Sequence, residues 1–340
     1  MHIKFWQFNA PTKRTFIRAL AAAAVSLPVF LSWPLKDATA NVPFDQWLNA
    51  FKVEATAAGI RPEIINDAFS GIATIPRVIE LDRKQPEFTL TFDQYLTRVV
   101  PNSRVKKGRQ KLAENRAILE KIGAEYGVQP KYIVAFWGVE TDFGRVTGGF
   151  KLIPALATLA HDGRRSAYFR KELLNALKIL NQGHIKAKDM VGSWAGAMGQ
   201  CQFMPSSFLN FAVDHDGDGR KDIWTTKADV FASAANYLSR SGWKGDQTWG
   251  RAVTLPDGFD IAMEGLKIRK PISEWQRLGV RRKDGSDLPK RDLQAAIRLV
   301  DGPGSPAYMV YNNFHTIMKW NRSTYFAVAV GTLAEKIGAK

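Results

Sequence analysis

The residue best placed for acid–base chemistry in this sequence is Glu140, in the run Ala135-Phe-Trp-Gly-Val-Glu-Thr-Asp-Phe-Gly144. The run ends an apolar helical stretch, so Phe136, Trp137 and Glu140 can share one helix face. Burial among aromatic rings favours the protonated carboxyl group, which a general acid needs at neutral pH. The alternative is a helix-end carboxylate satisfied by a salt bridge. Asp142 would point about 200° away around the axis, which makes it a poor second carboxylate.

A second run, Gly196-Ala-Met-Gly-Gln-Cys-Gln-Phe-Met-Pro-Ser-Ser207, is rich in small residues and amides and poor in charge. Such a composition suits a sugar-binding groove. Ser193 lies just before this run, but position 191 is valine instead of the glycine that a Gly-x-Ser-x-Gly elbow requires. The sequence therefore does not favour Ser193 as a nucleophile. Cys201, the single cysteine, is expected to be a small buried hydrophobic residue.

Residues 214–222 read Asp-His-Asp-Gly-Asp-Gly-Arg-Lys-Asp, which matches the start of an EF-hand loop. The candidate metal ligands are Asp214, Asp216, Asp218, the backbone carbonyl of Arg220, and Asp222. The bidentate glutamate expected at the twelfth position is absent, because Thr225 stands there. We expect a structural calcium site, with a plain acidic turn as the alternative.

The elements that must position these residues are mainly helical. Apolar residues recur at helical spacing over most of the chain, whereas Pro, Gly and Asp punctuate short apolar runs between Gly250 and about Tyr308. We therefore expect an α+β fold, mainly α. The predicted divisions are a signal peptide at 1–40, a helical domain at 41–108, a catalytic core with the acidic loop at 109–249, a β-rich insert at 250–310 and a helical return at 311–340.

The amino terminus reads as an export signal. A basic leader precedes a short apolar stretch, and Ala38-Thr39-Ala40 fits a cleavage site that would leave Asn41 first. The stretch is short for a membrane-spanning helix, which needs about 20 residues. Thr12-Lys13-Arg14 resembles a twin-arginine signal with Lys in the first position, so the Sec and twin-arginine routes both stay open. We expect a soluble periplasmic protein.

The whole chain carries 48 Lys and Arg and 32 Asp and Glu, a net charge of +16. Without the five basic and one acidic residues of 1–40, 43 and 31 remain, a net charge of +12. Such a charge suits an anionic partner, and export weighs against nucleic acid. The single cysteine excludes an internal disulfide.

Four separated motifs resemble the membrane-bound lytic transglycosylase B family. They are Trp137-Gly-Val-Glu-Thr-Asp-Phe-Gly144, Asp162-Gly-Arg-Arg-Ser-Ala-Tyr-Phe-Arg170, the run 196–207 and Asn313-Phe-His-Thr-Ile-Met-Lys-Trp-Asn-Arg322. The resemblance extends from about Phe44 to the carboxyl terminus. It implies a lysozyme-like core with a helical amino-terminal domain and a small antiparallel β insert. The sequence lacks the lipobox cysteine of the lipidated members, so membrane attachment is not implied.

The resemblance also implies an activity: cleavage of peptidoglycan between N-acetylmuramic acid and N-acetylglucosamine, leaving a 1,6-anhydro sugar. Glu140 would be the sole catalytic carboxylate, first acid and then base, without a catalytic cofactor. Ser193 would help to orient it. The implied groove residues are Ser193, Gln202, Phe203, Tyr95, Tyr168, Tyr237 and Asn313, and the acidic loop matches the calcium loop of the family.

The implied partners are peptidoglycan glycan strands, with cell-wall synthesis enzymes as candidate protein partners, and we expect a monomer. Two alternatives remain open. A muramidase of the same fold would add water instead of closing the anhydro ring, and a non-catalytic wall-binding protein would keep only the groove.

Overall fold

The computed structural model describes residues 42–84 and 90–339. The predicted signal peptide lies outside these residues. The described chain is mainly helical with small antiparallel sheets, which confirms the predicted fold class. Among its helices, none combines the length and the apolar character that crossing a membrane requires.

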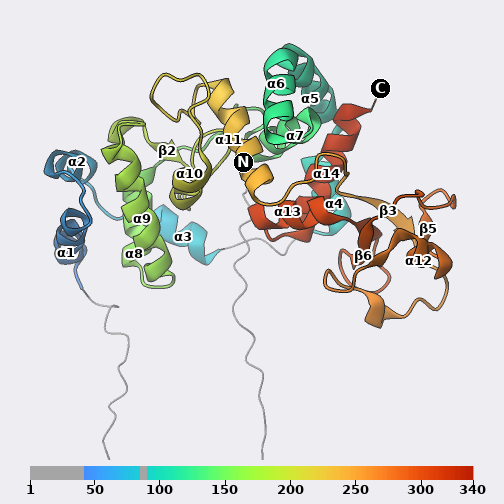
Figure 1. Ribbon diagram of the computed structural model, residues 1–340. Helices are drawn as coiled ribbons and strands as arrows, with labels where there is room; N and C mark the ends of the chain where they lie inside the picture. The colour runs from blue at the N-terminus through green and yellow to red at the C-terminus, as the bar shows by residue number, and fades with distance from the viewer. Residues whose placement is uncertain (1–41, 85–89, 340) are drawn as a thin grey trace, which may run out of the picture.

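The first three helices cover one end of the molecule. Helices α1 (Phe44–Ala57), α2 (Pro62–Ala68) and α3 (Pro76–Arg83) pack against α8 (Leu152–His161) and α9 (Ser166–Asn181), as the left side of Figure 1 shows. Proline opens α2 and α3, where its missing N–H costs nothing. The amino-terminal helices therefore belong to the layer formed by α8 and α9.

The next helices build a different layer. Helices α4 (Phe92–Val99) and α5 (Asn102–Glu114) pack against α14 (Thr324–Gly338), and α5 also packs against α7 (Pro130–Thr141). The segment predicted as one helical domain at 41–108 is thus divided between two ends of the molecule (Figure 1). Sequence periodicity predicts the helices, but it does not report which distant helices they contact.

Helix α7 lies at the centre of the core. Nine of its residues are buried, including Tyr132, Phe136 and Trp137. It contacts α14, α5, α6 (Arg116–Tyr126) and α11 (Lys227–Arg240). A helix that is apolar on most sides requires such neighbours, because exposing any of its apolar faces to water would be unfavourable.

Shorter elements connect the two layers. Strand β1 (Phe150–Lys151) pairs with β2 (Val191–Gly192), and α10 (Pro205–Phe211) packs against α9 and α11. A 3-10 turn at Ala187–Asp189 precedes β2.

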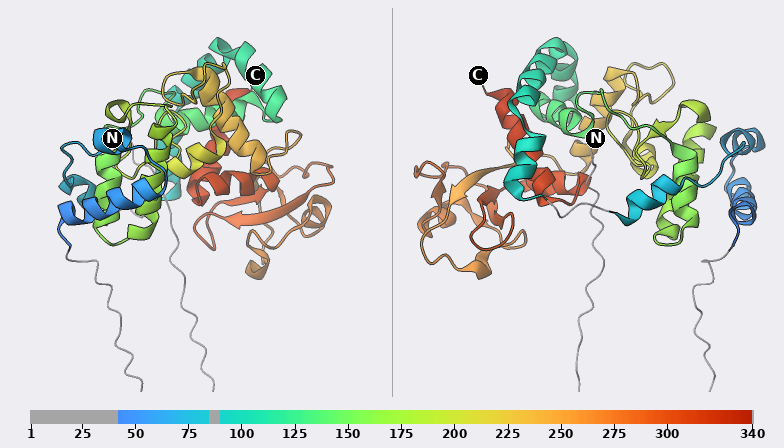
Figure 2. Two further views of the ribbon diagram at one scale, coloured as in Figure 1. Left: turned by 60° about the vertical axis from the view of Figure 1, so that its left-hand side comes forward. Right: turned by 180° about the vertical axis from the view of Figure 1, so that it is seen from behind.

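The predicted β insert forms a separate unit with its own core, visible at the lower right of Figure 1 and again in Figure 2. Its antiparallel strand order is β4-β6-β7-β3-β5. Trp275, Ile297 and Met309 are fully buried in its core. Its elements are β3 (Gly250–Thr254), a 3-10 turn at Ile261–Met263, β4 (Lys270–Pro271), α12 (Ile272–Arg277), β5 (Arg281–Arg282), β6 (Gln294–Leu299) and β7 (Ala307–Val310).

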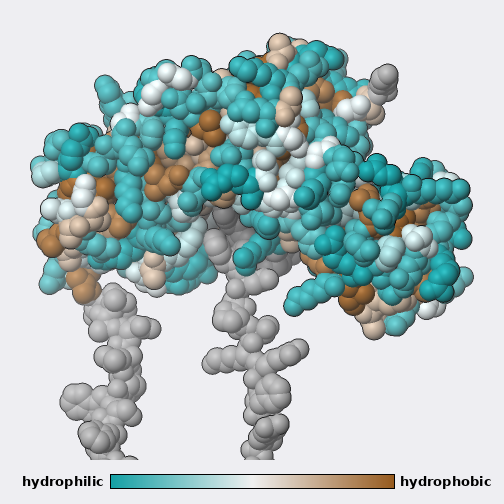
Figure 3. All heavy atoms as spheres, in the orientation of Figure 1, coloured by the Kyte–Doolittle hydropathy of each residue, from teal (hydrophilic) through white to brown (hydrophobic). Residues whose placement is uncertain are grey.

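After the insert, the chain returns to the helical body through α13 (Asn312–Trp320) and α14. Hydrophilic residues cover most of the face shown in Figure 3, with apolar residues in separate patches. The return through α13 brings a residue far along the chain to Glu140.

Candidate active site

Glu140 lies in the last turn of α7 and is 8% exposed. Asp142 and Phe143 follow with φ angles of 51° and 63°, so the helix ends in the left-handed region directly after the glutamate. The indole Nε1–H of Trp320, at the end of α13, donates a hydrogen bond of 2.7 Å to Glu140 Oε1. Glu140 is therefore a buried carboxyl group with a neutral donor on one oxygen.

Aromatic rings surround this contact. The ring of Trp320 lies 4.6 Å from Phe136, 4.7 Å from Tyr237 and 5.2 Å from Phe203 between centroids. Glu140 also lines a small, largely apolar cavity together with Trp137. The predicted apolar setting of the glutamate is present in the structure.

Gln200, in the run 196–207, forms hydrogen bonds with the end of α7. Its Oε1 accepts a 2.7 Å bond from Trp137 Nε1, and its Nε2 donates to the Trp224 carbonyl at 2.8 Å. The hydroxyl of Thr141 donates to the backbone carbonyl of Gln200 at 3.1 Å. Gly144 packs so closely that a Cβ there would collide with the Gln200 side chain. These contacts hold Glu140 and the loop 196–204 in one arrangement.

Gln202 and Ser193 shape this loop. Gln202 has a φ of 51°, and its Nε2 donates to the carbonyls of Thr147 at 2.8 Å and Gly199 at 2.9 Å. The hydroxyl of Ser193 accepts the Ala197 N–H at 3.0 Å. In the structure Ser193 therefore caps a turn of the loop, and the prediction that it orients Glu140 stays a prediction.

Tyr95 on α4 is 3% exposed and lies close enough to Glu140 for an electrostatic interaction between the two side chains. Burial and then the charge of Glu140 raise the pKa of Tyr95, while Arg104 opposes the shift. Tyr237 donates its hydroxyl to the Lys319 carbonyl at 2.7 Å, and burial raises the pKa of this residue to about 12. Both tyrosines are therefore neutral donors or packing residues at physiological pH.

Tyr168 lies on α9, in the layer beyond the loop. Its ring meets Phe169 at 5.1 Å, and burial, followed by the charge of Glu172, raises the pKa of Tyr168. The place of Tyr168 in a groove stays a prediction.

Asn313 differs from the prediction. It is fully buried, and its Nδ2 donates to the carbonyls of Lys244 at 2.8 Å and Gln247 at 2.9 Å. Its Oδ1 accepts the Lys244 N–H at 2.8 Å. Asn313 thus joins α13 to the loop before the β insert, and it is not a surface residue of the groove.

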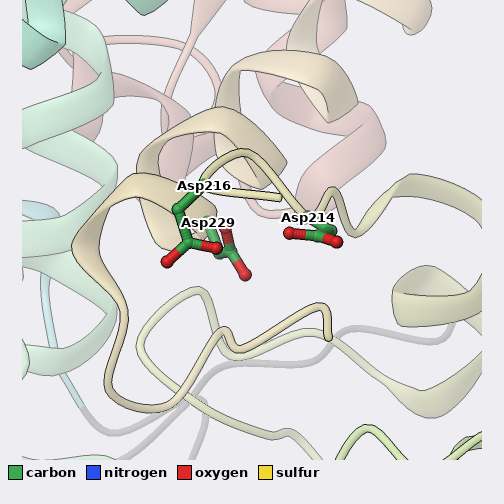
Figure 4. A group of neighbouring side chains, drawn as sticks. All are labelled: Asp214, Asp216 and Asp229. Carbon is green, nitrogen blue, oxygen red and sulfur yellow. The ribbon is translucent and has the colours of Figure 1, made fainter. Parts of the chain in front are cut away.

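The acidic loop brings together Asp214, Asp216 and Asp229, each offering an oxygen within 4.8 Å of the others (Figure 4). Asp229 on α11 was not predicted as a ligand, because it lies beyond the twelfth position of the loop. It is fully buried, and burial raises its pKa although the His215 and Asp222 N–H groups donate to it.

The other predicted metal ligands have different contacts. Asp218 pairs with Arg220 at 3.0 Å, and Asp222 accepts the N–H groups of Trp224 and Thr225 at 2.9 Å. Asp218 and Asp222 are therefore not part of the acidic group. A set of three carboxylates suits a hard cation such as Ca²⁺, which prefers oxygen ligands.

Two important residues were missed in the sequence. Trp320 lies within the motif 313–322, but only its position relative to Glu140, 180 residues earlier, reveals the hydrogen bond. Gln200 belongs to the predicted loop, but its role depends on the indole of Trp137.

Known proteins resemble this chain in sequence and in fold. The chain is 37% identical over 225 residues to the membrane-bound lytic murein transglycosylase B of Escherichia coli K12, and the match covers 62% of this chain. It covers 58% of the E. coli protein, so the match spans less than two thirds of that relative's length.

Solved structures match over more of the chain. SltB3 of Pseudomonas aeruginosa in complex with NAG-NAM-pentapeptide has a TM-score of 0.85 at 44% identity, covering 87% of this chain and 80% of that one. The E. coli lytic transglycosylase Slt35 in complex with calcium has a TM-score of 0.73 at 29% identity, covering 88% and 94%.

A family model described as the transglycosylase SLT domain matches residues 43–335. This range includes the glutamate, the loop, the acidic group and the β insert described above. The chain belongs to the transglycosylase SLT domain family.

Proposed function

We propose that this protein is a peptidoglycan lytic transglycosylase in which Glu140 is the only general acid and base. The observation that carries the proposal is the buried Glu140 carboxyl group, bonded to the Trp320 indole and enclosed by aromatic rings. Asp142, the nearest carboxylate along the chain, pairs instead with Arg104, Lys107 and Arg145. This arrangement supports a mechanism that uses one carboxylate.

In the proposed reaction, protonated Glu140 donates to the glycosidic oxygen while the bond from the muramyl anomeric carbon to that oxygen breaks. The substrate acetamido group stabilises the positive charge on the anomeric carbon, as in substrate-assisted glycosidases. The Glu140 carboxylate then takes the proton of the muramyl 6-hydroxyl, and this oxygen bonds to the anomeric carbon. The products are a free N-acetylglucosamine 4-hydroxyl and a 1,6-anhydro end, with no water consumed.

Trp320 supports both proton transfers in this scheme. A donor N–H interacts more strongly with a carboxylate than with a neutral acid. The Trp320 indole therefore stabilises the form of Glu140 that exists between the two steps.

We propose that the glycan lies along Ser193, Gln202, Phe203, Tyr95, Tyr168 and Tyr237. Phe203 and Tyr237 support this placement because both pack against Trp320, which contacts Glu140. SltB3 in complex with NAG-NAM-pentapeptide supports a substrate of this class.

We propose that Asp214, Asp216 and Asp229 hold a structural Ca²⁺, supported by the acidic group and by the calcium complex of Slt35. The ion would join the loop to α11 without entering the reaction. The proposed location is the periplasm, where the substrate lies, and the proposed partners are glycan strands together with cell-wall synthesis enzymes.

The test is release of soluble muropeptides from purified sacculi by Glu140→Gln and by a control, Glu335→Gln. Glu335 also accepts hydrogen bonds, from Tyr132 at 2.8 Å and Thr248 at 2.9 Å, but on α14. Loss of a general acid is expected to lower the rate by about 10²- to 10⁴-fold. Cleavage by Glu140→Gln at the rate of the control would refute the assignment.

A further inference from the structure

Three basic side chains share one carboxylate directly after Glu140. Asp142 lies 2.7 Å from Arg145 Nε, 3.3 Å from Lys107 Nζ and 3.6 Å from Arg104 Nε. One negative charge thus faces three positive charges. We call Arg104, Lys107 and Arg145 the cationic cluster.

The Asp142 carboxylate forms ion pairs with all three residues of the cationic cluster. Burial alone would raise the pKa of Asp142, but the hydrogen bonds from Arg145 and Lys107 and the charges of Lys107 and Arg104 hold this pKa below its usual range. Asp142 is therefore ionised at neutral pH, and the cluster retains an excess of two positive charges.

The cluster has unused donor capacity. Arg104 Nε is buried and has no hydrogen-bond partner among the described residues, and its side chain is only 9% exposed. Side chains of Lys107 and Arg145 are 34% and 63% exposed. The exposed side chains of Lys107 and Arg145 can therefore donate charge-assisted hydrogen bonds to an incoming anion.

The cluster also lies beside the proposed active site. Arg145 belongs to the segment 142–147, which Gln200 contacts at Gly144 and Gln202 holds through the Thr147 carbonyl. Tyr95 interacts electrostatically with both Glu140 and Arg104. The loop that follows the proposed catalytic residue therefore carries Arg145, while α5 carries Arg104 and Lys107.

We propose that the cationic cluster binds a carboxylate of the peptide stem carried by the muramic acid next to the cleaved bond. The glycan itself offers hydroxyl and acetamido groups, whereas a peptide stem carries free carboxylates, and guanidinium groups bind carboxylates in a directed way. Arg145 and Lys107 supply the exposed contacts, and the positive charge of the buried Arg104 adds to the attraction. This inference rests on the proposed function, because it names a substrate group recognised beside Glu140.

The test compares two ligands in the Glu140→Gln background, which prevents cleavage under the proposed function. One ligand is a peptidoglycan tetrasaccharide that carries pentapeptide stems, and the other is the same tetrasaccharide without peptide. Arg145→Gln is compared with Arg116→Gln, a control at a similarly exposed arginine that pairs with Glu120 at 3.4 Å. Binding is measured by calorimetry at low and at physiological salt.

We expect Arg145→Gln to weaken binding of the peptide-bearing ligand about fivefold, as for loss of one partly exposed charged contact. Binding of the peptide-free ligand and both affinities of Arg116→Gln should stay within twofold, and higher salt should reduce the difference. Equal affinities of Arg145→Gln and Arg116→Gln for the peptide-bearing ligand would overturn the carboxylate site while leaving the proposed function intact. If Glu140→Gln bound neither ligand, the proposed function itself would fail.

Discussion

Replacing Trp320 with phenylalanine is expected to slow catalysis without abolishing the fold. The change removes the Nε1–H that donates to Glu140 Oε1 at 2.7 Å, but it keeps an aromatic ring against Phe136 and Phe203. Hydrogen bonds to charged groups contribute about 1.5–3 kcal/mol, and those between neutral groups about 0.5–1.5 kcal/mol. The bond to Trp320 therefore favours the carboxylate over the protonated form by about 1–1.5 kcal/mol.

This difference corresponds to about a tenfold loss of kcat, since each 1.36 kcal/mol is a factor of ten in rate. KM should change less than twofold, because the bond mainly stabilises the form of Glu140 that develops during the reaction. The assay is the initial rate of muropeptide release over a range of sacculus concentrations.

Trp249→Phe is a matched control. Trp249 is also buried, at 3% exposure, and its Nε1 has no hydrogen-bond partner among the described residues. Both variants lose ring volume and should lose about 1–2 kcal/mol of unfolding free energy, measured by urea denaturation. Only Trp320→Phe should lose activity. Equal kcat values for the two variants would refute the role given to the Trp320 indole.

Three further predictions concern the loop, the acidic group and a buried glutamate. Gly144→Ala should lower both activity and the melting temperature, because the position has a φ of +80° and a Cβ would press on Gln200; unchanged values in both assays would contradict the proposed coupling. Added Ca²⁺ should raise the melting temperature of the wild type, and Asp229→Asn should remove most of that increase; an equal increase in both proteins would exclude Asp229 as a ligand. Burial raises the pKa of Glu172 above 4.5 despite two bonds from Ser206, so the folded state favours its proton. The stability that Glu172 contributes is fully present below the pKa of this residue in the unfolded chain, and it is lost as the pH rises through the higher pKa of the folded protein. Between these two pKa values, Glu172→Gln should therefore gain unfolding free energy relative to the wild type. A pH-independent difference in unfolding free energy would contradict this account.

Sequence reasoning was most successful where the pattern is local. The apolar stretch before Glu140 predicts the buried helix that carries the glutamate in its last turn. The short apolar runs separated by Pro, Gly and Asp after Gly250 predict the β insert that the structure contains. Local dihedral preferences and hydrophobic periodicity determine both features.

The misses are all consequences of long-range packing. The helices of 41–108 separate because α1 to α3 bury their apolar faces on α8 and α9, whereas α4 and α5 bury theirs on α14. Asn313 has the sequence context of a groove residue, but the return of α13 places it against the Lys244 backbone. Asp229 joins the acidic group because α11 packs back over the loop, which no spacing rule for the loop includes.

In the proposed reaction Glu140 acts alone, and the muramyl 6-hydroxyl, instead of water, ends the reaction. The most direct test digests purified sacculi in H₂¹⁸O and analyses the muropeptides by mass spectrometry. We predict 1,6-anhydro ends without ¹⁸O from the wild-type protein and no new ends from Glu140→Gln. Reducing ends that carry ¹⁸O, in place of anhydro ends, would contradict the account and identify the protein as a hydrolytic muramidase.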